Sequence, residues 1–133
     1  MKIKNNKRVF LCSDHHFGQE NFYKFNKKRN ITLRPQFPNA STADKEIISR
    51  HNSIVPEKDS VVFFLGDTVK DYTYLSKFDK MNGEEKYLVM GNHDSKISPQ
   101  LLLDYFDSVF GAVYLGQFGM VLTHVPIHPL ELR

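Results

Sequence analysis

Three short runs of apolar residues constrain the fold more than any other feature of the sequence. They span residues 8–12, 61–65 and 86–90, are rich in Val, Phe and Leu, and are separated by stretches with helical spacing. Runs of this kind are typical of strands that are covered by helices on both faces, as in a mostly parallel sheet. The pattern predicts an α/β fold and a single domain over residues 1–133.

The segments between and after these runs predict helices and a hairpin. Apolar side chains recur at helical spacing in three of them, residues 41–55, 74–81 and 98–106. Ser41 or Thr42 is the expected N-cap of the first helix, and Gly83 is the expected left-handed C-cap of the second. The last two apolar runs, residues 112–115 and 120–124, predict a β-hairpin.

Composition and the single cysteine limit the class of protein. The chain is 41% hydrophobic and 25% charged, which argues against disorder. Its apolar runs are far too short to cross a bilayer, and its basic N-terminus lacks the apolar core of a signal peptide. Cys12 alone cannot form an intrachain disulfide, which fits a reducing compartment. We therefore expect a cytoplasmic protein that makes no membrane contact.

The distribution of charge leaves two interpretations of one segment. A net charge of +3 permits an anionic substrate but is too small to indicate a nucleic-acid-binding protein. Residues 22–38 are more basic, and their cations are interleaved with aromatic side chains. Such a stretch can bind phosphates or single-stranded nucleic acid. The competing interpretation, which we favour at this stage, is a solvated loop or short helix whose aromatic side chains pack inward.

Polar side chains follow the ends of four predicted strands. They are Asp14, His15 and His16 after the first, Asp67 after the second, Asn92, His93 and Asp94 after the third, and His124 at the end of the last. Ligands of open α/β sheets bind beyond the carboxyl ends of the strands. Oxygen and imidazole donors without thiolate suit Mn²⁺, Fe or Zn²⁺ at a hydrolytic centre.

Each of these clusters has a purely structural interpretation when it is taken alone. Gly66-Asp67 is a common turn pair, and Asp14 could cap a backbone beside two surface histidines. His51 lies on the apolar face of a predicted helix, where a packed histidine is more common than a ligand. The functional interpretation gains weight because the clusters recur at equivalent positions, which turn chemistry does not require. The glycines before Asp67 and Asn92 also let the backbone approach a bound ion or phosphate closely.

The ordered clusters resemble the pattern of the calcineurin-like metallophosphoesterases. That pattern is Asp-x-His, Gly-Asp, Gly-Asn-His followed by Asp or Glu, a lone His, and finally Gly-His-x-His. The matching motifs in this sequence are Asp14-His15-His16, Gly66-Asp67, Gly91-Asn92-His93-Asp94 and His124. The resemblance covers nearly the whole chain. It implies a layered β-sheet sandwich flanked by helices, and an enzyme that hydrolyses a phosphomonoester or a phosphodiester.

The residues around the first motif resemble those of a subgroup of this family. Residues 13–21 and Arg34-Pro35 look like small bacterial and phage phosphoesterases. In that subgroup Gly18 is usually followed by His, whereas this chain has Gln19. The substrate that the resemblance implies is a phosphoester of a small molecule or nucleotide, with nucleic acid as a further option.

The resemblance also implies a role for each residue. Asp14 and His16 would bind a first divalent ion, Asn92 and His124 a second, and Asp67 would bridge the two. His93 would protonate the leaving oxygen or steady the phosphate, and Asp94 would orient His93. The expected metal is Mn²⁺, with Fe, Zn²⁺ and Ni²⁺ as alternatives. Two such ions can clamp a phosphoryl group and activate a water as nucleophile, and their mutual repulsion requires a bridging carboxylate such as Asp67.

The family pattern is not complete in this sequence. No Gly-His-x-His follows His124 before the chain ends at Arg133. We therefore expect a C-terminally incomplete domain in which each ion lacks one imidazole. An alternative function follows, in which the chain is a non-catalytic or incomplete fragment that binds one metal or needs a partner chain. Self-association, or complementation by a C-terminal segment, is expected on the same ground.

Overall fold

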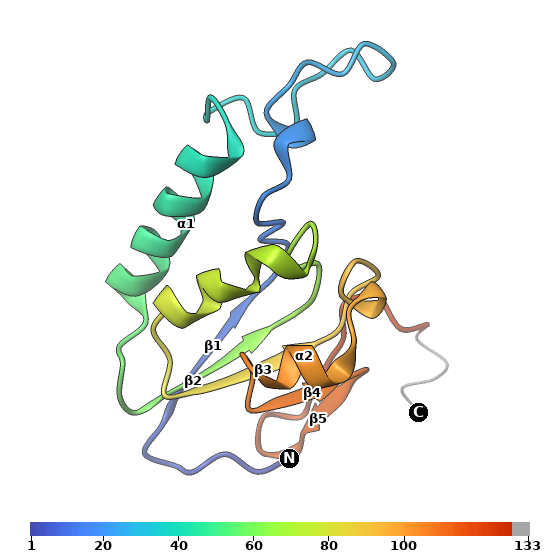
Figure 1. Ribbon diagram of the computed structural model, residues 1–133. Helices are drawn as coiled ribbons and strands as arrows, with labels where there is room; N and C mark the ends of the chain where they lie inside the picture. The colour runs from blue at the N-terminus through green and yellow to red at the C-terminus, as the bar shows by residue number, and fades with distance from the viewer. Residues whose placement is uncertain (129–133) are drawn as a thin grey trace.

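The fold is built on a four-stranded parallel sheet. The computed structural model describes residues 1–128, and residues 129–133 of the expected domain lie outside this part. The strands are hydrogen-bonded in sequence order (Figure 1): β1 (Arg8–Cys12), β2 (Ser60–Phe64), β3 (Glu85–Val89) and β4 (Ser108–Phe110). The α/β prediction is confirmed, and the first three strands lie within one residue of the predicted runs. The sequence analysis missed β4, which is too short to give a pattern.

The central strand β2 organises two apolar clusters, one on each face of the sheet. Every residue of β2 is buried. Val62 and Phe64 point into the cluster under the helices, whereas Val61 and Phe63 point into the cluster on the opposite face. The expectation that β1 is also buried on both faces is wrong. β1 is an edge strand, and its Leu11 side chain is 44% exposed.

Helices cover one face of the sheet. They are α1 (Ala40–Ile54), the 3₁₀ helix η2 (Tyr72–Lys80) and the short α2 (Pro99–Leu103), which Ser98 caps as its serine-proline start predicts. The N-cap of α1 is Asn39 and not Ser41 or Thr42, because the Asn39 side chain accepts from the Thr42 amide and starts the helix earlier. Gly83 is no left-handed cap, since its φ is 147° and Met81 closes η2 in an extended conformation.

A hairpin covers the opposite face. β5 (Val113–Leu115) and β6 (Met120–Leu122) pair antiparallel, as predicted, and the 3₁₀ turn η4 (Gly116–Phe118) with a left-handed Gly119 connects them. Val113, Leu115 and Leu122 join the apolar cluster on this face. Helices, sheet and hairpin thus form successive layers, which confirms the layered architecture (Figure 1). None of the helices within residues 1–128 has the length and apolar character needed to cross a membrane.

Candidate metal centre

The loops that follow β1, β2 and β3 meet at the carboxyl edge of the sheet, and backbone hydrogen bonds join them. The amides of Asp14 and His16 donate to the carbonyls of Gly66 and Asp67, both at 3.0 Å. The amide of His93 donates to Asp67 Oδ1, also at 3.0 Å. The polar clusters that the sequence places after separate strands therefore form one site.

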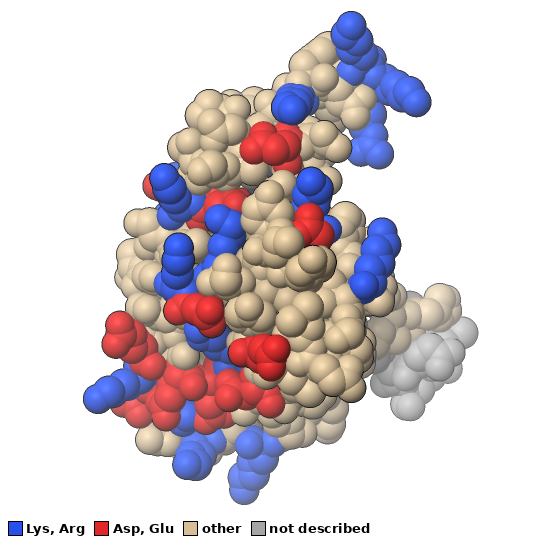
Figure 2. Space-filling model, viewed as in Figure 1, with Lys and Arg blue, Asp and Glu red and all other residues tan. Residues whose placement is uncertain are grey.

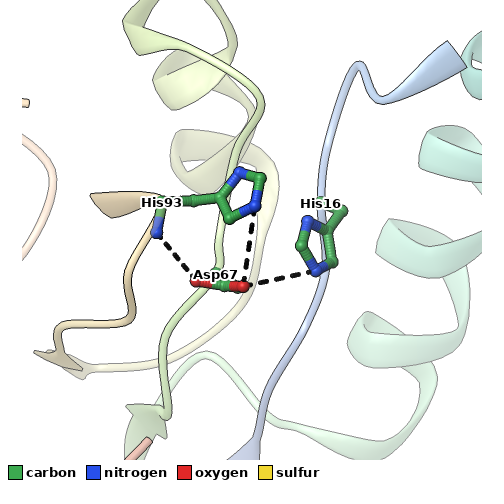
Figure 3. Close-up of side chains that lie close together, drawn as sticks. All are labelled: His16, Asp67 and His93. Atoms are coloured by element: carbon green, nitrogen blue, oxygen red, sulfur yellow. Dashed lines mark hydrogen bonds and ion pairs between the residues drawn. The ribbon is translucent and has the colours of Figure 1, made fainter. Parts of the chain in front are cut away.

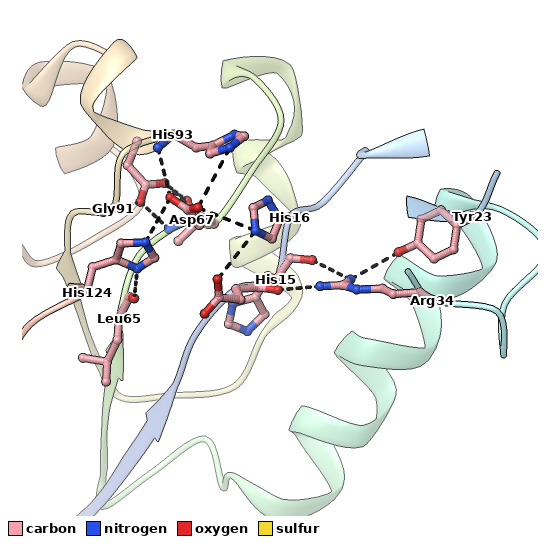
Figure 4. A network of polar contacts seen from close by, with 12 residues as sticks. His15, His16, Tyr23, Arg34, Leu65, Asp67, Gly91, His93 and His124 are labelled. Atoms are coloured by element: carbon pink, nitrogen blue, oxygen red, sulfur yellow. Dashed lines mark hydrogen bonds and ion pairs between the residues drawn. The ribbon is translucent and has the colours of Figure 1, made fainter. Parts of the chain in front are cut away.

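Asp67 lies at the centre of this site and is faced by three imidazoles. Its carboxylate oxygens lie 3.6 Å from His16 Nε2, 3.9 Å from His93 Nε2 and 3.5 Å from His124 Nε2 (Figures 3 and 4). These separations are too long for hydrogen bonds. Two donors bound to one ion at about 2.1 Å lie about 3.0–3.4 Å apart, so the observed spacings are close to the edge of a coordination polyhedron.

The carboxylate and imidazole donors fall into two groups that share Asp67. One group is His16, Asp67 and His93, and the other is Asp14, Asp67 and His124; within each, the donor atoms lie within 4.8 Å of one another. A shared carboxylate between two groups of donors fits a pair of ions. His16 Nε2 also lies 3.6 Å from Asp14 Oδ1, so the spacing fits both this grouping and the family-implied assignment, which pairs Asp14 with His16 and keeps His93 as a proton donor. How the donors divide between ions remains a prediction.

His124 has the proton arrangement of a metal ligand. Its Nδ1 lies 2.8 Å from the Leu65 carbonyl, which can only accept a hydrogen bond. Nδ1 therefore carries the proton, and the lone pair of Nε2 points toward Asp67. Metal-binding histidines are commonly held by such a second hydrogen bond, which fixes both tautomer and ring orientation.

The backbone is strained at three of these residues. Asp14, His16 and Asp67 have φ values of 56°, 49° and 51°, in the left-handed region that side chains other than glycine rarely adopt. Such conformations cost free energy and cluster at functional sites, where the surrounding structure enforces them. This concentration of strain supports a role for the three side chains beyond turn formation.

Two glycines allow the loops after β2 and β3 to come close to each other, whereas the expected approach of these glycines to a bound ion or phosphate stays a prediction. A Cβ atom on Gly66 would lie 2.5 Å from the Gly91 amide nitrogen and 2.6 Å from His124 Nδ1. A Cβ atom on Gly91 would lie 2.5 Å from the Asp67 amide nitrogen. Only glycine permits this approach without displacing backbone or ligand atoms.

The hydrogen bonds of the Asp94 carboxylate join two loops, and its expected role in orienting His93 stays a prediction. The Asp94 side chain is fully buried. Its oxygens accept from the amides of Asp67 at 2.7 Å, Thr68 at 3.0 Å and Gly91 at 2.8 Å, and from the Thr68 hydroxyl. These contacts fully engage the carboxylate, so Asp94 joins the loop after β2 to the loop after β3.

Asn92 and His93 sit at the rim of the site. Asn92 is exposed, and its carbonyl accepts from the Ser95 hydroxyl at 2.8 Å. The His93 side chain is 31% exposed, and its ring packs edge-on against that of His16 with centroids 5.0 Å apart. The position of His93 suits a group that meets both a substrate and solvent, whereas ligation by Asn92 stays a prediction.

Burial lowers the basicity of the two histidines after β1. It lowers the pKa of His16, against the opposing effect of the Asp67 carboxylate, and it lowers the pKa of His15 to about 4. The His15 ring packs among Phe17, Phe64 and Phe78 and belongs to the core. His16 is therefore neutral at neutral pH, which is the state in which an imidazole binds metal.

Arg34 also belongs to the site, although it was not among the site residues expected from the sequence. Its guanidinium donates to the carbonyls of Asp14 at 2.6 Å and His15 at 3.0 Å, and to the Tyr23 hydroxyl at 3.2 Å (Figure 4). These bonds hold the strained loop after β1 from outside the sheet. The only signal in the sequence is the Arg34-Pro35 pair that resembles the phosphoesterase subgroup.

The sequence matches that of a known family. The pattern that defines the calcineurin-like phosphoesterases matches residues 7–129. The chain belongs to this family. Within the calcineurin-like phosphoesterases, membership of the bacterial and phage subgroup remains a prediction, as do the roles of the individual Asp and His residues.

Two relatives extend the comparison. The uncharacterized protein MJ1445 of Methanocaldococcus jannaschii is 28% identical over 124 residues, which cover 90% of this chain and 60% of that protein. The crystal structure of AQ665, a protein of unknown function from Aquifex aeolicus, shares the fold with a TM-score of 0.64 and 24% identity. That match covers 92% of this chain and 63% of AQ665. The chain thus spans less than two thirds of the length of either relative.

Proposed function

We propose that this calcineurin-like phosphoesterase hydrolyses a phosphomonoester or phosphodiester with two divalent metal ions, Mn²⁺ being the preferred one. The observation that carries the proposal is the buried Asp67 carboxylate, which three imidazoles face at 3.6, 3.9 and 3.5 Å. A carboxylate shared by two groups of donors is what a pair of mutually repelling cations requires.

The proposed ligands are Asp14, His16, Asp67, Asn92 and His124. When bound, the divalent ions supply Lewis acidity and lower the pKa of water toward neutrality. Asp67 holds the two halves of the ligand set together, because its oxygens face both groups. The Leu65 carbonyl keeps the Nε2 lone pair of His124 directed into the site.

His93 is the proposed proton donor to the leaving oxygen. Its backbone amide is fixed on Asp67 Oδ1 while its ring remains partly open to solvent. A ring in this position can meet the substrate and exchange its proton with water between turnovers. General acid catalysis of this kind contributes about 10²–10⁴-fold in rate.

A second candidate function keeps the metal site but needs another chain for turnover. Leu11, Phe118 and Met120 are exposed apolar residues around a cavity of about 190 Å³ beside β1 and the hairpin. Exposed apolar surface of this kind marks contact sites between chains. Self-association or a complementing segment is therefore the alternative, in which the isolated chain binds metal but turns over slowly.

The test combines metal content with hydrolysis of nitrophenyl phosphate esters by the purified chain. We expect two ions per chain, activity that EDTA abolishes, and recovery with Mn²⁺. Asp67→Asn should remove both ions and nearly all activity, because it weakens the shared ligand. Asp104→Asn, at the exposed aspartate that follows α2, should change neither. Full turnover in metal-free protein would refute the proposal. Tight metal binding without turnover would favour the second candidate.

His93→Asn separates protonation from metal binding. Turnover should fall about 10²–10⁴-fold on an alkyl ester, a poor leaving group, and much less on a nitrophenyl ester, which needs little protonation. Metal content should stay at the wild-type level. If the variant loses its ions, His93 is a ligand, as its grouping with His16 and Asp67 would also allow.

A further inference from the structure

A basic arm, residues 24–33, projects from the body of the protein between η1 (Glu20–Phe22) and α1 (Figure 1). It is a formed hairpin. Asn26 and Ile31 pair antiparallel, and the Asn26 amide donates to the Ile31 carbonyl at 2.8 Å. The Asn26 side chain accepts from the amides of Lys28 and Arg29 at 3.0 and 3.1 Å, which closes the tip. Such order lowers the entropy cost of binding a partner.

The arm carries positive charge that nothing in the described chain neutralises. Its four cations are exposed: Lys24, Lys27, Lys28 and Arg29. The sequence has no acidic residue between Glu20 and Asp44, and none of the four cations forms an ion pair within residues 1–128. Figure 2 shows Lys and Arg side chains gathered on this projection, with no acidic side chain at its tip. The net charge of the whole protein is only +3, so the arm is a local concentration.

Apolar side chains lie exposed beside these cations. Phe25 is 60% exposed, Ile31 45% and Leu33 44%. The aromatic side chains at the base of the arm pack inward, as the interpretation favoured from the sequence expects, and Tyr23 is buried against Ala40 and Ala43. Phe25 does not. An exposed aromatic ring beside cations is the combination that binds single-stranded nucleic acid, through base stacking and phosphate contacts.

The base of the arm is fastened to the candidate metal centre. The Arg34 amide donates to the Phe22 carbonyl at 2.9 Å, and the Arg34 guanidinium holds the carbonyls of Asp14 and His15. The Phe22 ring packs edge-on against the His16 ring with centroids 4.7 Å apart. The base of the arm therefore lies beside the ligands after β1.

We propose that the basic arm binds the backbone of single-stranded nucleic acid, and that this polynucleotide is the substrate of the metal centre. The inference rests on the proposed phosphoesterase function and narrows its substrate class. Hydrolysis adds water across one phosphodiester. The water oxygen bonds to phosphorus, the bond from phosphorus to one sugar oxygen breaks, and that oxygen takes up a proton. The arm supplies affinity and direction, and it takes no part in the bond changes.

The experiment compares two triple variants of the Mn²⁺-loaded protein. Lys27→Ala/Lys28→Ala/Arg29→Ala removes the cations at the tip of the arm. Lys2→Ala/Lys58→Ala/Lys80→Ala removes the same charge from exposed sites elsewhere and is the matched control. Binding is measured by fluorescence anisotropy with a labelled phosphorothioate oligothymidine of about 15 nucleotides, near the upper range of single-strand site sizes. Hydrolysis is measured on an ordinary oligothymidine and on a nitrophenyl phosphodiester.

We expect the arm variant to bind the oligonucleotide more than tenfold more weakly at about 0.1 M salt, with a salt slope smaller by about 2. Its cleavage of the oligonucleotide should fall in parallel, while turnover of the nitrophenyl ester and the behaviour of the control variant stay at the wild-type level. Phe25→Ala, which leaves the charge intact, should weaken binding roughly tenfold through lost stacking.

Several results would overturn the inference. Equal losses in the two triple variants would mean that net charge and not the arm is responsible. Binding of the wild type to phosphatidylserine vesicles but not to the oligonucleotide would assign the arm to a membrane surface. Hydrolysis of the nitrophenyl ester without cleavage of the oligonucleotide would refute the substrate class alone. Failure on every ester, with arm-dependent binding retained, would refute the phosphoesterase function and support the arm as a binding element.

Discussion

The loop after β1 and the loops after β2 and β3 carry the same kinds of ligand, but different contacts fix them in place. The second and third loops share the fully buried Asp94, whose carboxylate accepts the amides of Asp67, Thr68 and Gly91. The first loop is held from its periphery, by the Arg34 guanidinium on two carbonyls and by Asp44, which accepts from the Gly18 amide at 3.1 Å.

The loop after β1 also differs from the loops after β2 and β3 in how well its buried polar atoms are hydrogen-bonded. Within residues 1–128, the buried side-chain atoms without a hydrogen-bond partner are His15 Nδ1, His16 Nδ1 and Asp44 Oδ1. All three belong to the first loop or to its tether. Burial also raises the pKa of Asp44, although the Lys77 ammonium opposes this. The comparison teaches that one buried carboxylate joins the loops after β2 and β3, whereas the loop after β1 is held by Arg34 and Asp44, which follow it in the sequence.

Removing Asp94 should give the largest loss of stability, and it tests how the loops after β2 and β3 are held. Asp94→Ala would leave three amides and a hydroxyl without their acceptor, and we expect a loss of about 3–5 kcal/mol in unfolding free energy. Urea denaturation monitored by circular dichroism measures it. Asp44→Ala removes a buried carboxylate that holds the loop after β1, and it should lower the unfolding free energy less. Equal losses of stability in the two variants would mean that the loop after β1 is held as firmly as the loops after β2 and β3.

Gly91→Ala should give the next effect. The new methyl would lie 2.5 Å from the Asp67 amide nitrogen, so the loops after β2 and β3 must separate. We expect about 1–3 kcal/mol of destabilisation, the range for overpacked sites, and a clear fall in metal content. Gly111→Ala is the control, because its Cβ would have no neighbour within 4 Å and its φ is not positive. Unchanged metal content in Gly91→Ala would show that this approach is not needed.

Arg34→Met should give the smallest effect on global stability, with its consequences confined to the first loop. Burial raises the pKa of the Cys12 thiol at the end of β1 to about 12, so this thiol is nearly inert to alkylation in the folded state. Loss of the guanidinium should destabilise the loop by about 1 kcal/mol and raise the alkylation rate of Cys12 several-fold. Arg29→Met, at the tip of the arm, is the control. Equal rates in both variants would mean that Arg34 does not hold the loop.

The sequence allowed much of the scaffold to be predicted, for a physical reason. The runs that became β1, β2 and β3 are buried or half-buried strands whose apolar content is required locally, so each could be recognised by itself. The remaining strand of the parallel sheet, β4, has only three residues. Its position depends on pairing with β3, which no local pattern encodes. The cap at Asn39 was missed because Ser41 is an equally good cap residue and Thr42 is also a favoured one.

For the site, the sequence by itself determined which residue types stand at the ends of which strands. Parallel strands bring their carboxyl ends to one edge, so Asp14, Asp67 and His93 could be expected to meet. His124 follows β6 of the separate hairpin, so its place beside them depends on how the hairpin packs on the sheet. Only the tertiary structure decided how they are held. The bonds of Asp94 to two loops and of Arg34 to a third join segments distant in sequence. The direction of a buried hydrogen bond depends on the final packing of both partners, which no spacing along the chain records.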